Sequence, residues 1–233
     1  MSWLGPEGWA ALVLSLKVSF WATLVSLPFA VAVAWVLARK RFPGHGVLNG
    51  LVHLPLILPP VVTGYLLLLG LGPQAPLGAF LQDTFGITFA FRWTGAALAA
   101  AIMAFPLTVR AIRIAVEAVD PKLEQAAATL GASRLQVFLT VTLPLIAPGI
   151  LAGTVLAFAK AMGEFGATIT FVSNIPGETQ TVPSAIYAFL QVPGGENDAM
   201  KLVLVSVCVA MGALALSEVV SRRIARRIGG QDA

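Results

Sequence analysis

Two oppositely charged side chains stand four residues apart in an otherwise apolar stretch of the sequence, Lys160 and Glu164. On a continuous helix, residues at this spacing share a face and can form an ion pair. Ionisable groups in an apolar surrounding are costly unless they are paired, and unpaired ones mark functional sites. The flanking Gly163 and Gly166 indicate that the helix loosens here. We therefore expect a pairing or structural role for Glu164 ahead of direct contact with a ligand.

Three prolines interrupt a second apolar run, at Pro55, Pro59 and Pro60. A proline inside a helix lacks the backbone N–H of the helical ladder, so the carbonyls that it frees must find other partners or line a cavity. Two interpretations stay open: a kink that serves packing, and the wall or gate of a pathway. Thr63 and Gly64 directly follow the prolines and strengthen the second interpretation.

Other residue types that carry chemistry are scarce. The chain has one cysteine, Cys208, and two histidines, His45 and His53, which makes a metal site improbable. The sequence contains no Gly-x-x-x-x-Gly-Lys-[Ser/Thr] segment, so it encodes no Walker-type nucleotide site. The apolar runs hold no His/Asp/Ser or paired-aspartate constellation that would support an intramembrane enzyme. We therefore expect a protein that is not itself an enzyme.

The elements that must position these residues follow from the composition. The 233 residues are 58% hydrophobic and 11% charged, whereas a soluble domain is about 45–50% apolar and about 25% charged. This excludes a disordered chain and disfavours a water-soluble enzyme. A membrane-spanning helix needs about 20 apolar residues, so the length allows about five or six spans. The composition predicts one all-α membrane domain.

Five apolar segments are long enough to be considered as spans. None of them alternates polar and apolar residues with a period of two, so a membrane β-barrel is rejected. Turn signals bound a stretch at 181–192 that we expect to form a short interfacial or re-entrant helix, and the long connection at 72–93 carries aromatic residues suited to an interface. The five segments are 10–38, 51–71, 94–109 (continuing as an amphipathic helix to 116), 141–162 and 202–220.

The basic residues predict the direction of the spans. In a five-span arrangement, 11 of the 15 lysines and arginines lie on one side, and that side also holds the basic tail at 221–233. The opposite side holds Arg92 and Lys201. Because basic loops stay in the cytoplasm, we expect an N-terminus outside and a C-terminus inside. The eleven are Arg39, Lys40, Arg41, Arg110, Arg113, Lys122, Arg134, Arg222, Arg223, Arg226 and Arg227.

The connection between the third and fourth spans contains a short helix with its own start and stop signals. Asp120 is a capping residue, Pro121 suits the first turn, and Gly131 suits a left-handed stop. A short surface helix with one small apolar face fits a groove on another protein. The apolar face consists of Leu123, Ala126, Ala127 and Leu130.

This connection resembles the EAA loop of ABC importer permeases. In that pattern, Glu-Ala-Ala is followed by three residues, a glycine, nine residues, an aliphatic residue, any residue, and Leu-Pro. The spacing fits throughout, but Gln125 stands at the acidic position and Glu124 precedes it. The residues that match or flank the pattern are Glu124, Gln125, Ala126, Ala127, Leu130, Gly131, Val141, Leu143 and Pro144.

Further segments resemble the molybdate permeases within that family, and the sulfate and thiosulfate permeases share part of the pattern. The segments are 15–19, 53–65, 85–91, 163–179 and 186–196. The resemblance implies a type I ABC importer transmembrane domain at 10–220, in the bacterial cytoplasmic membrane, that moves molybdate or tungstate by alternating access. It also implies a homodimer, two cytoplasmic ABC ATPase subunits that bind ATP and Mg, a periplasmic molybdate-binding protein, and no nucleic-acid partner.

Two alternatives stay open: a sulfate or thiosulfate permease, and, in another class, an ion-coupled secondary transporter. The second would usually show inverted repeats and intramembrane acids, which this sequence lacks apart from Glu164.

The resemblance also directs attention to residues that could line the anion pathway or its gate. Uncharged hydroxyl donors suit brief contact with a dianion, and Thr168, Thr170 and Ser173 supply them. For Lys17 we favour a lipid-facing position near a helix end, and for Arg110 and Arg113 we favour topology and headgroup contact over an exit-side anion site. The candidate pathway residues are Pro59, Pro60, Thr63, Gly64, Glu164, Phe165, Gly166 and Thr168.

Overall fold

The computed structural model of the protein describes residues 3–228, and no β-strand occurs among them. The all-α fold expected from the composition is confirmed for this part of the chain. In chain order the helices are α1 (Gly5–Arg39), α2 (His45–Ile57), α3 (Pro60–Leu71), α4 (Pro76–Phe85), α5 (Trp93–Ala118), α6 (Pro121–Thr129), α7 (Arg134–Val137), the π-helical turn η1 (Phe138–Thr142), α8 (Leu143–Met162), α9 (Gly166–Val172), α10 (Val182–Leu190) and α11 (Glu196–Ile228).

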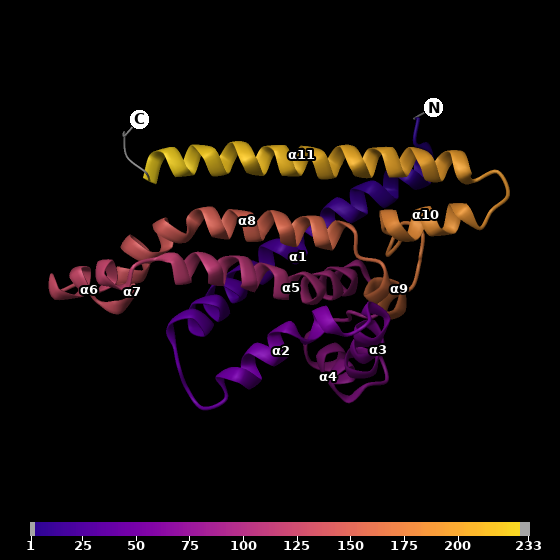
Figure 1. Cartoon of the computed structure of the whole chain (residues 1–233). Helices are drawn as coiled ribbons and strands as arrows, with labels where there is room; N and C mark the ends of the chain where they lie inside the picture. Colours follow the sequence, from indigo (N-terminus) through magenta and orange to yellow (C-terminus); the bar gives the residue numbers. More distant parts are fainter. Residues whose placement is uncertain (1–2, 229–233) are drawn as a thin grey trace.

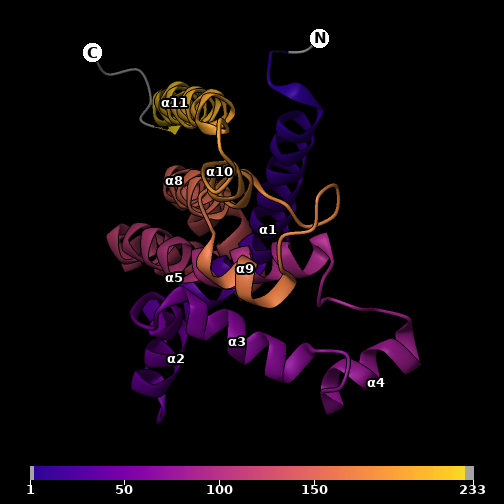
Figure 2. The ribbon, with the colours of Figure 1, turned by 90° about the vertical axis from the view of Figure 1, so that its right-hand side faces the viewer.

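The long helices α1 and α8 pack against α5, and α11 packs against α8 and α10. Helix α11 lies along one side of the molecule, α8 and α5 run beneath it, and α1 crosses them at an angle (Figure 1). The end view shows α2 and α3 on the side opposite α11 (Figure 2). Buried alanines on α5, among them Ala96, Ala100 and Ala104, let α1 and α8 approach its backbone closely.

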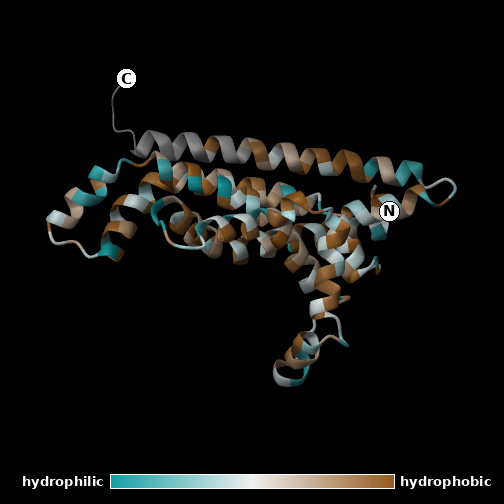
Figure 3. Ribbon diagram, turned by 60° about the horizontal axis from the view of Figure 1, so that its bottom comes forward, coloured by the Kyte–Doolittle hydropathy of each residue, from teal (hydrophilic) through white to brown (hydrophobic). Residues whose placement is uncertain are grey.

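Four helical stretches are long and apolar enough to cross a membrane, and a bent pair of helices is a fifth candidate. The four are Gly5–Arg39, Trp93–Ala118, Arg134–Met162 and Glu196–Ala215. Figure 3 shows hydrophobic residues along the long helices and hydrophilic residues mainly toward the α6–α7 end and in the connection before α11. Each stretch contains or largely overlaps one of the apolar segments expected from the sequence.

The second expected span is not one straight helix. Helices α2 and α3 meet at an angle of 112°, and the break falls at Leu58 and Pro59, which are both extended (ψ 142° and 135°). Pro59 disfavours the helical conformation of the residue before it, and neither Pro59 nor Pro60 can donate to the helical ladder. Pro55 stays inside α2, so the consecutive prolines, rather than the isolated one, break the helix.

Two further elements differ from the expectation. The connection at 72–93 contains the ten-residue helix α4, which ends at the left-handed Gly86. The fourth span starts at Arg134 rather than near residue 141, and it includes the π-helical turn. Pro144 follows that turn and cannot donate to the carbonyl four residues earlier, so the ladder is irregular there. The helix expected at 181–192 is confirmed as α10.

The connections that carry the basic residues gather at one end of the molecule. The α1–α2 loop and the end of α5 lie at the end from which α6 and α7 project, and α9 and α10 lie at the other (Figure 1). The tail at 221–233 is described only as backbone, as far as Ile228, and residues 229–233 lie outside the described residues.

Candidate functional site

The EAA-like loop, residues 120–144, begins with the short helix that its sequence predicts. The Asp120 carboxylate accepts a 2.9 Å hydrogen bond from the backbone N–H of Lys122, and Pro121 occupies the first turn. Gly131 adopts φ +89°, a conformation that favours glycine. Its N–H donates to the carbonyl of Ala128, which closes the end of α6. The predicted start and stop of this helix are confirmed.

Four leucines of this loop are exposed. Leu130 is 89% exposed, Leu135 67%, and Leu123 and Leu139 50% each. Helix α6 projects from the end of the helix bundle (Figure 1), and none of its residues is buried. Exposed large apolar side chains on one projecting segment are typical of a protein-binding surface.

Glu124 precedes the acidic position of the EAA pattern. Its carboxylate contacts two other side chains of this protein. Its Oε1 accepts a 2.7 Å hydrogen bond from the hydroxyl of Thr142, and its Oε2 lies 3.5 Å from Nε of Arg39. Arg39 also donates through Nη2 to the backbone carbonyl of Val119 at 2.9 Å. Gln125, at the acidic position itself, is exposed. Glu124 therefore ties α6 to the end of α1 and to the start of the fourth span.

We call these contacts of Glu124 with Arg39 and Thr142 the Glu124 latch. The sequence singled out Glu124 but gave no signal for its partners, which lie 85 and 18 residues away. The second half of the EAA-like loop is partly covered: Val141 and Leu143 are half-buried, and Pro144 is exposed.

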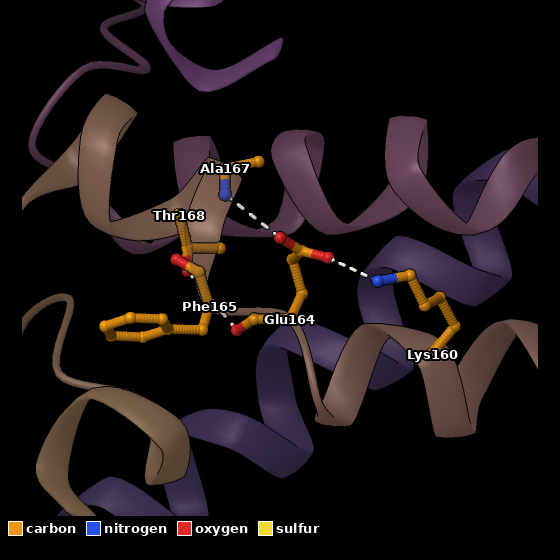
Figure 4. A network of polar contacts seen from close by, with 5 residues as sticks. All are labelled: Lys160, Glu164, Phe165, Ala167 and Thr168. Atoms are coloured by element: carbon orange, nitrogen blue, oxygen red, sulfur yellow. Dashed lines mark hydrogen bonds and ion pairs between the residues drawn. The ribbon is translucent and has the colours of Figure 1, made fainter. Parts of the chain in front are cut away.

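A second group of expected residues lies at the break between α8 and α9. Glu164 is only 2% exposed, and its Oε2 accepts a 2.7 Å hydrogen bond from Nζ of Lys160. Its Oε1 accepts a 3.0 Å hydrogen bond from the backbone N–H of Ala167 (Figure 4). The expected pairing of Lys160 with Glu164 is confirmed. The carboxylate joins the last turn of α8 to the first turn of α9.

The hydroxyl groups beyond this break donate to the backbone of their own turn. Thr168 Oγ1 donates to the carbonyl of Phe165 at 2.9 Å, and Thr170 Oγ1 donates to that of Gly166 at 2.8 Å. Ser173 is exposed and has φ +65°. The two threonine hydroxyl hydrogens are thus engaged locally, which leaves only their acceptor capacity for other partners.

The two candidate pathway segments, far apart in the sequence, meet in the structure. Helix α3 packs against α9, and at Gly64 a Cβ atom would lie 2.9 Å from the Cα of Ala167. A Cβ atom at Gly166 would lie 2.7 Å from that of Pro60. Both glycines permit a backbone approach that a larger residue would prevent. We call this contact the α3–α9 wall.

The other members of the candidate pathway group lie around this wall. Thr63 is buried, and its hydroxyl has no hydrogen-bond partner among the described residues. Pro59 is exposed. The ring of Phe165 stacks at a tilt on that of Tyr187, with 5.3 Å between the ring centroids.

The structure also shows the surroundings of three basic residues that the sequence analysis considered. Lys17 Nζ lies 3.6 Å from the ring centroid of Trp93, a cation–π contact. Arg113 donates to Glu117 at 2.7 Å and to Asn49 at 3.1 Å. Arg110 is exposed.

The sequence matches one protein-family model, that of the binding-protein-dependent transport system inner membrane component, over residues 26–230. Over 224 residues the chain is 60% identical to the molybdenum transport system permease protein ModB of Escherichia coli K12, covering 96% of this chain and 97% of that one. It is 38% identical to the sulfate transport system permease protein CysT of Salmonella typhimurium, covering 80% and 67% respectively.

Solved structures of ABC importers share the fold. A chain of a bacterial ABC transporter involved in the import of alginate superposes with a TM-score of 0.75, at 20% identity, over 95% of this chain and 81% of that one. A chain of the MetNI methionine ABC transporter, in an inward-facing conformation, gives a TM-score of 0.70 at 14% identity, over 97% and 100%.

Proposed function

The chain belongs to the family of binding-protein-dependent transport system inner membrane components, and we propose that it moves molybdate or tungstate into the cell. It is a multi-pass permease subunit of an ABC importer, and the ATPase of such importers is a separate subunit. The observation that carries the substrate is the 60% identity to ModB over nearly the full length of both chains.

The likeness to CysT makes sulfate the second candidate. That likeness is lower in identity and covers 67% of the sulfate permease, so molybdate is favoured. Both anions are tetrahedral dianions. ATPase activity stimulated by binding protein loaded with molybdate, tungstate or sulfate distinguishes the two functions.

We further propose a homodimer of this chain with two ModC-like ATPases in the cytoplasm and a ModA-like periplasmic binding protein. The domain covers 10–220, and the basic tail at 221–233 lies in the cytoplasm. The gathering of the basic connections at the end that bears the EAA-like loop supports five spans with the N-terminus outside. A related assembly, the alginate transporter, has been crystallised in complex with its periplasmic protein.

The EAA-like loop supplies the surface for the ATPase. Exposed Leu123 and Leu130 would insert into a groove on that subunit. The Glu124 latch would then carry a displacement of α6 to α1 and to the fourth span, because one carboxylate accepts the hydrogen bond from Thr142 and forms the ion pair with Arg39.

The α3–α9 wall would form the gate of the anion pathway. Broken helices at membrane depth are tolerated where they line a cavity or are buried in protein, and both the α2–α3 and the α8–α9 breaks meet there. Alternating access would then be a change in the packing of α3 on α9 that is driven from α6. Glu164 would hold α9 in place through Lys160 and Ala167 rather than bind the anion, because its carboxylate would repel a dianion.

The test is transport by the complete complex in proteoliposomes. We expect uptake of molybdate that depends on ATP and on the loaded binding protein. Uptake of sulfate alone would refute the substrate assignment but leave the permease function intact. A complex that purifies without any ATPase subunit would refute the importer assignment.

A further inference from the structure

A charged cavity lies at the end of the molecule that bears the EAA-like loop. Its volume is about 380 Å³, and it is lined by the end of α1, the α1–α2 loop, the start of α2 and the end of α5. Five of its eight lining residues are ionisable: Lys40, Arg41, His45, Arg113 and Glu117. Three of them are cations at neutral pH and one is an anion, so the cavity has an excess of positive charge.

One of the three cations of the cavity is paired within the protein, and the other two are exposed. Arg113 is held by Glu117 and by Asn49. Its ion pair with Glu117 neutralises the only acid that lines the cavity. His45 has Nε2 3.0 Å from the carbonyl oxygen of Leu37, so this nitrogen carries the hydrogen and the ring is oriented. Lys40 and Arg41 are exposed at the rim. The cavity therefore offers two exposed cations, of which Lys40 also lies 5.3 Å from the ring centroid of Trp35. Together with the guanidinium that is paired with Glu117, they leave a net positive charge that suits an anionic phosphate group.

A separate apolar groove lies farther along the same three helices, and it shares no lining residue with the charged cavity. Its volume is about 480 Å³, and its lining includes Phe29 from α1, Leu51 and Pro55 from α2, and Ala101, Ile102 and Phe105 from α5. No ionisable residue lines it. A single occupant that reaches both the cavity and the groove must be anionic at one end and apolar along its length.

The spacing along the helices matches such an occupant. Phe105 precedes Arg113 by eight residues on α5, and Leu51 follows His45 by six on α2, which correspond to about 12 Å and about 9 Å of helix. Both offsets run in the same direction, away from the EAA-like loop. The hydrocarbon of one bilayer leaflet is about 15 Å deep, so one acyl chain spans this distance.

We propose that this cavity and groove bind one anionic phospholipid, with its phosphodiester headgroup among Lys40, Arg41 and Arg113 and an acyl chain between α1, α2 and α5. The site adjoins the coupling machinery, because Lys40 directly follows Arg39 of the Glu124 latch. A bound lipid would thus stabilise the ends of α1 and α5 on which α6 is mounted. The inference does not depend on which anion the importer carries.

The experiment is a lipid titration of the purified, delipidated complex of this chain with its ATPase, followed by native mass spectrometry. Phosphatidylglycerol is the probe, and phosphatidylcholine and inorganic phosphate are the comparison ligands. We expect one tightly bound phosphatidylglycerol for each permease chain, weaker binding of phosphatidylcholine, and no displacement by millimolar phosphate. Displacement by inorganic phosphate would show a site for free oxyanions and overturn the lipid assignment.

Two pairs of variants locate the site. Lys40→Gln with Arg41→Gln should weaken phosphatidylglycerol binding by about fivefold for each charge removed, whereas Arg110→Gln, an exposed arginine on α5 outside the cavity, should leave it unchanged. Ala101→Phe should fill the groove and reduce binding. Ala213→Phe, which lies in a separate apolar cavity formed by α1, α8 and α11, should not.

Equal binding by the Lys40/Arg41 variant and the Arg110 variant would overturn the proposal. Loss of binding in the Arg110 and Ala213 variants as well would also overturn it, because it would show non-specific adsorption. The charge variants alter only exposed side chains, so they test the headgroup site even if Ala101→Phe fails to fold.

Discussion

The hydroxyl of Thr142 donates a 2.7 Å hydrogen bond to Oε1 of Glu124. This contact joins α6 to the first turns of the fourth span, and Thr142 is 1% exposed. The same carboxylate lies 3.5 Å from Nε of Arg39 at the end of α1. One side chain therefore links α6, the helix proposed to bind the ATPase, to two membrane helices, and its removal is a direct test of how the permease is coupled.

Thr142→Val should uncouple the transporter while it stays assembled. Valine keeps the shape of threonine but cannot donate to Glu124, and the loss of a hydrogen bond to a charged group costs about 1.5–3 kcal/mol. We expect stimulation of ATPase activity by the loaded binding protein to fall severalfold. Thr140→Val is the matched control, since its exposed hydroxyl bonds only to the backbone of Gln136. Equal stimulation in both variants would contradict the role of the latch.

Gly131→Arg should release the ATPase from the permease. Gly131 has φ +89° with open space around its Cα, so a side chain there strains the turn and obstructs the docking surface without disturbing the helix bundle. Gly86→Arg makes the same change at the left-handed end of α4, at the far end of the molecule (φ +67°, also with open space). Co-purification should lose the ATPase in the first variant and keep it in the second. An intact complex with Gly131→Arg would refute docking through α6.

Gly64→Ala should impair transport, whereas Gly70→Ala on the same helix should not. A Cβ atom at Gly64 would collide with the backbone of Ala167, and one at Gly70 would meet open space. Because alanine favours a helix over glycine by about 1 kcal/mol, Gly70→Ala should raise the thermal unfolding midpoint slightly. Comparison of uptake and unfolding for the two variants checks this, and tolerance of Gly64→Ala would contradict the close packing of the α3–α9 wall.

The ion pair at the α8–α9 break predicts an asymmetric double-mutant cycle. The side chain of Glu164 is 1% exposed, whereas that of Lys160 is 30% exposed. Lys160→Met leaves a buried carboxylate without its cation, a change that costs about 3–5 kcal/mol, whereas Glu164→Gln leaves a lysine that can turn toward water. Thermal unfolding should show Lys160→Met as the more damaging single change, with partial recovery in the double variant. Additive losses would mean that the two side chains act independently.

The short helix of the EAA-like loop was predictable from sequence because its signals are local. The Asp120 cap, Pro121 and the left-handed Gly131 act within one or two turns, so their types and spacing suffice. The same holds for Lys160 and Glu164, which are four residues apart. Helix α4 was not predicted for a related reason. The aromatic residues between 72 and 93 indicated an interface, but the stretch is too short to show a clear helical spacing of apolar residues.

The remaining features depend on contacts between distant segments. The approach of Gly64 to Ala167 joins positions about 100 residues apart, and no local pattern encodes it. Arg39 was predicted only as a basic residue that sets orientation, whereas the structure places it on Val119 and Glu124. Pro59 and Pro60 mark the position of the 112° bend between α2 and α3, but they do not reveal that α3 then packs on α9, a segment about 100 residues away.

The most direct test of the proposed function is ATPase activity of the complete complex in proteoliposomes, measured with binding protein loaded in turn with molybdate, tungstate and sulfate. The account predicts that protein loaded with molybdate or tungstate stimulates hydrolysis severalfold over unloaded protein, and that sulfate does not. Stimulation by sulfate without stimulation by molybdate would contradict it.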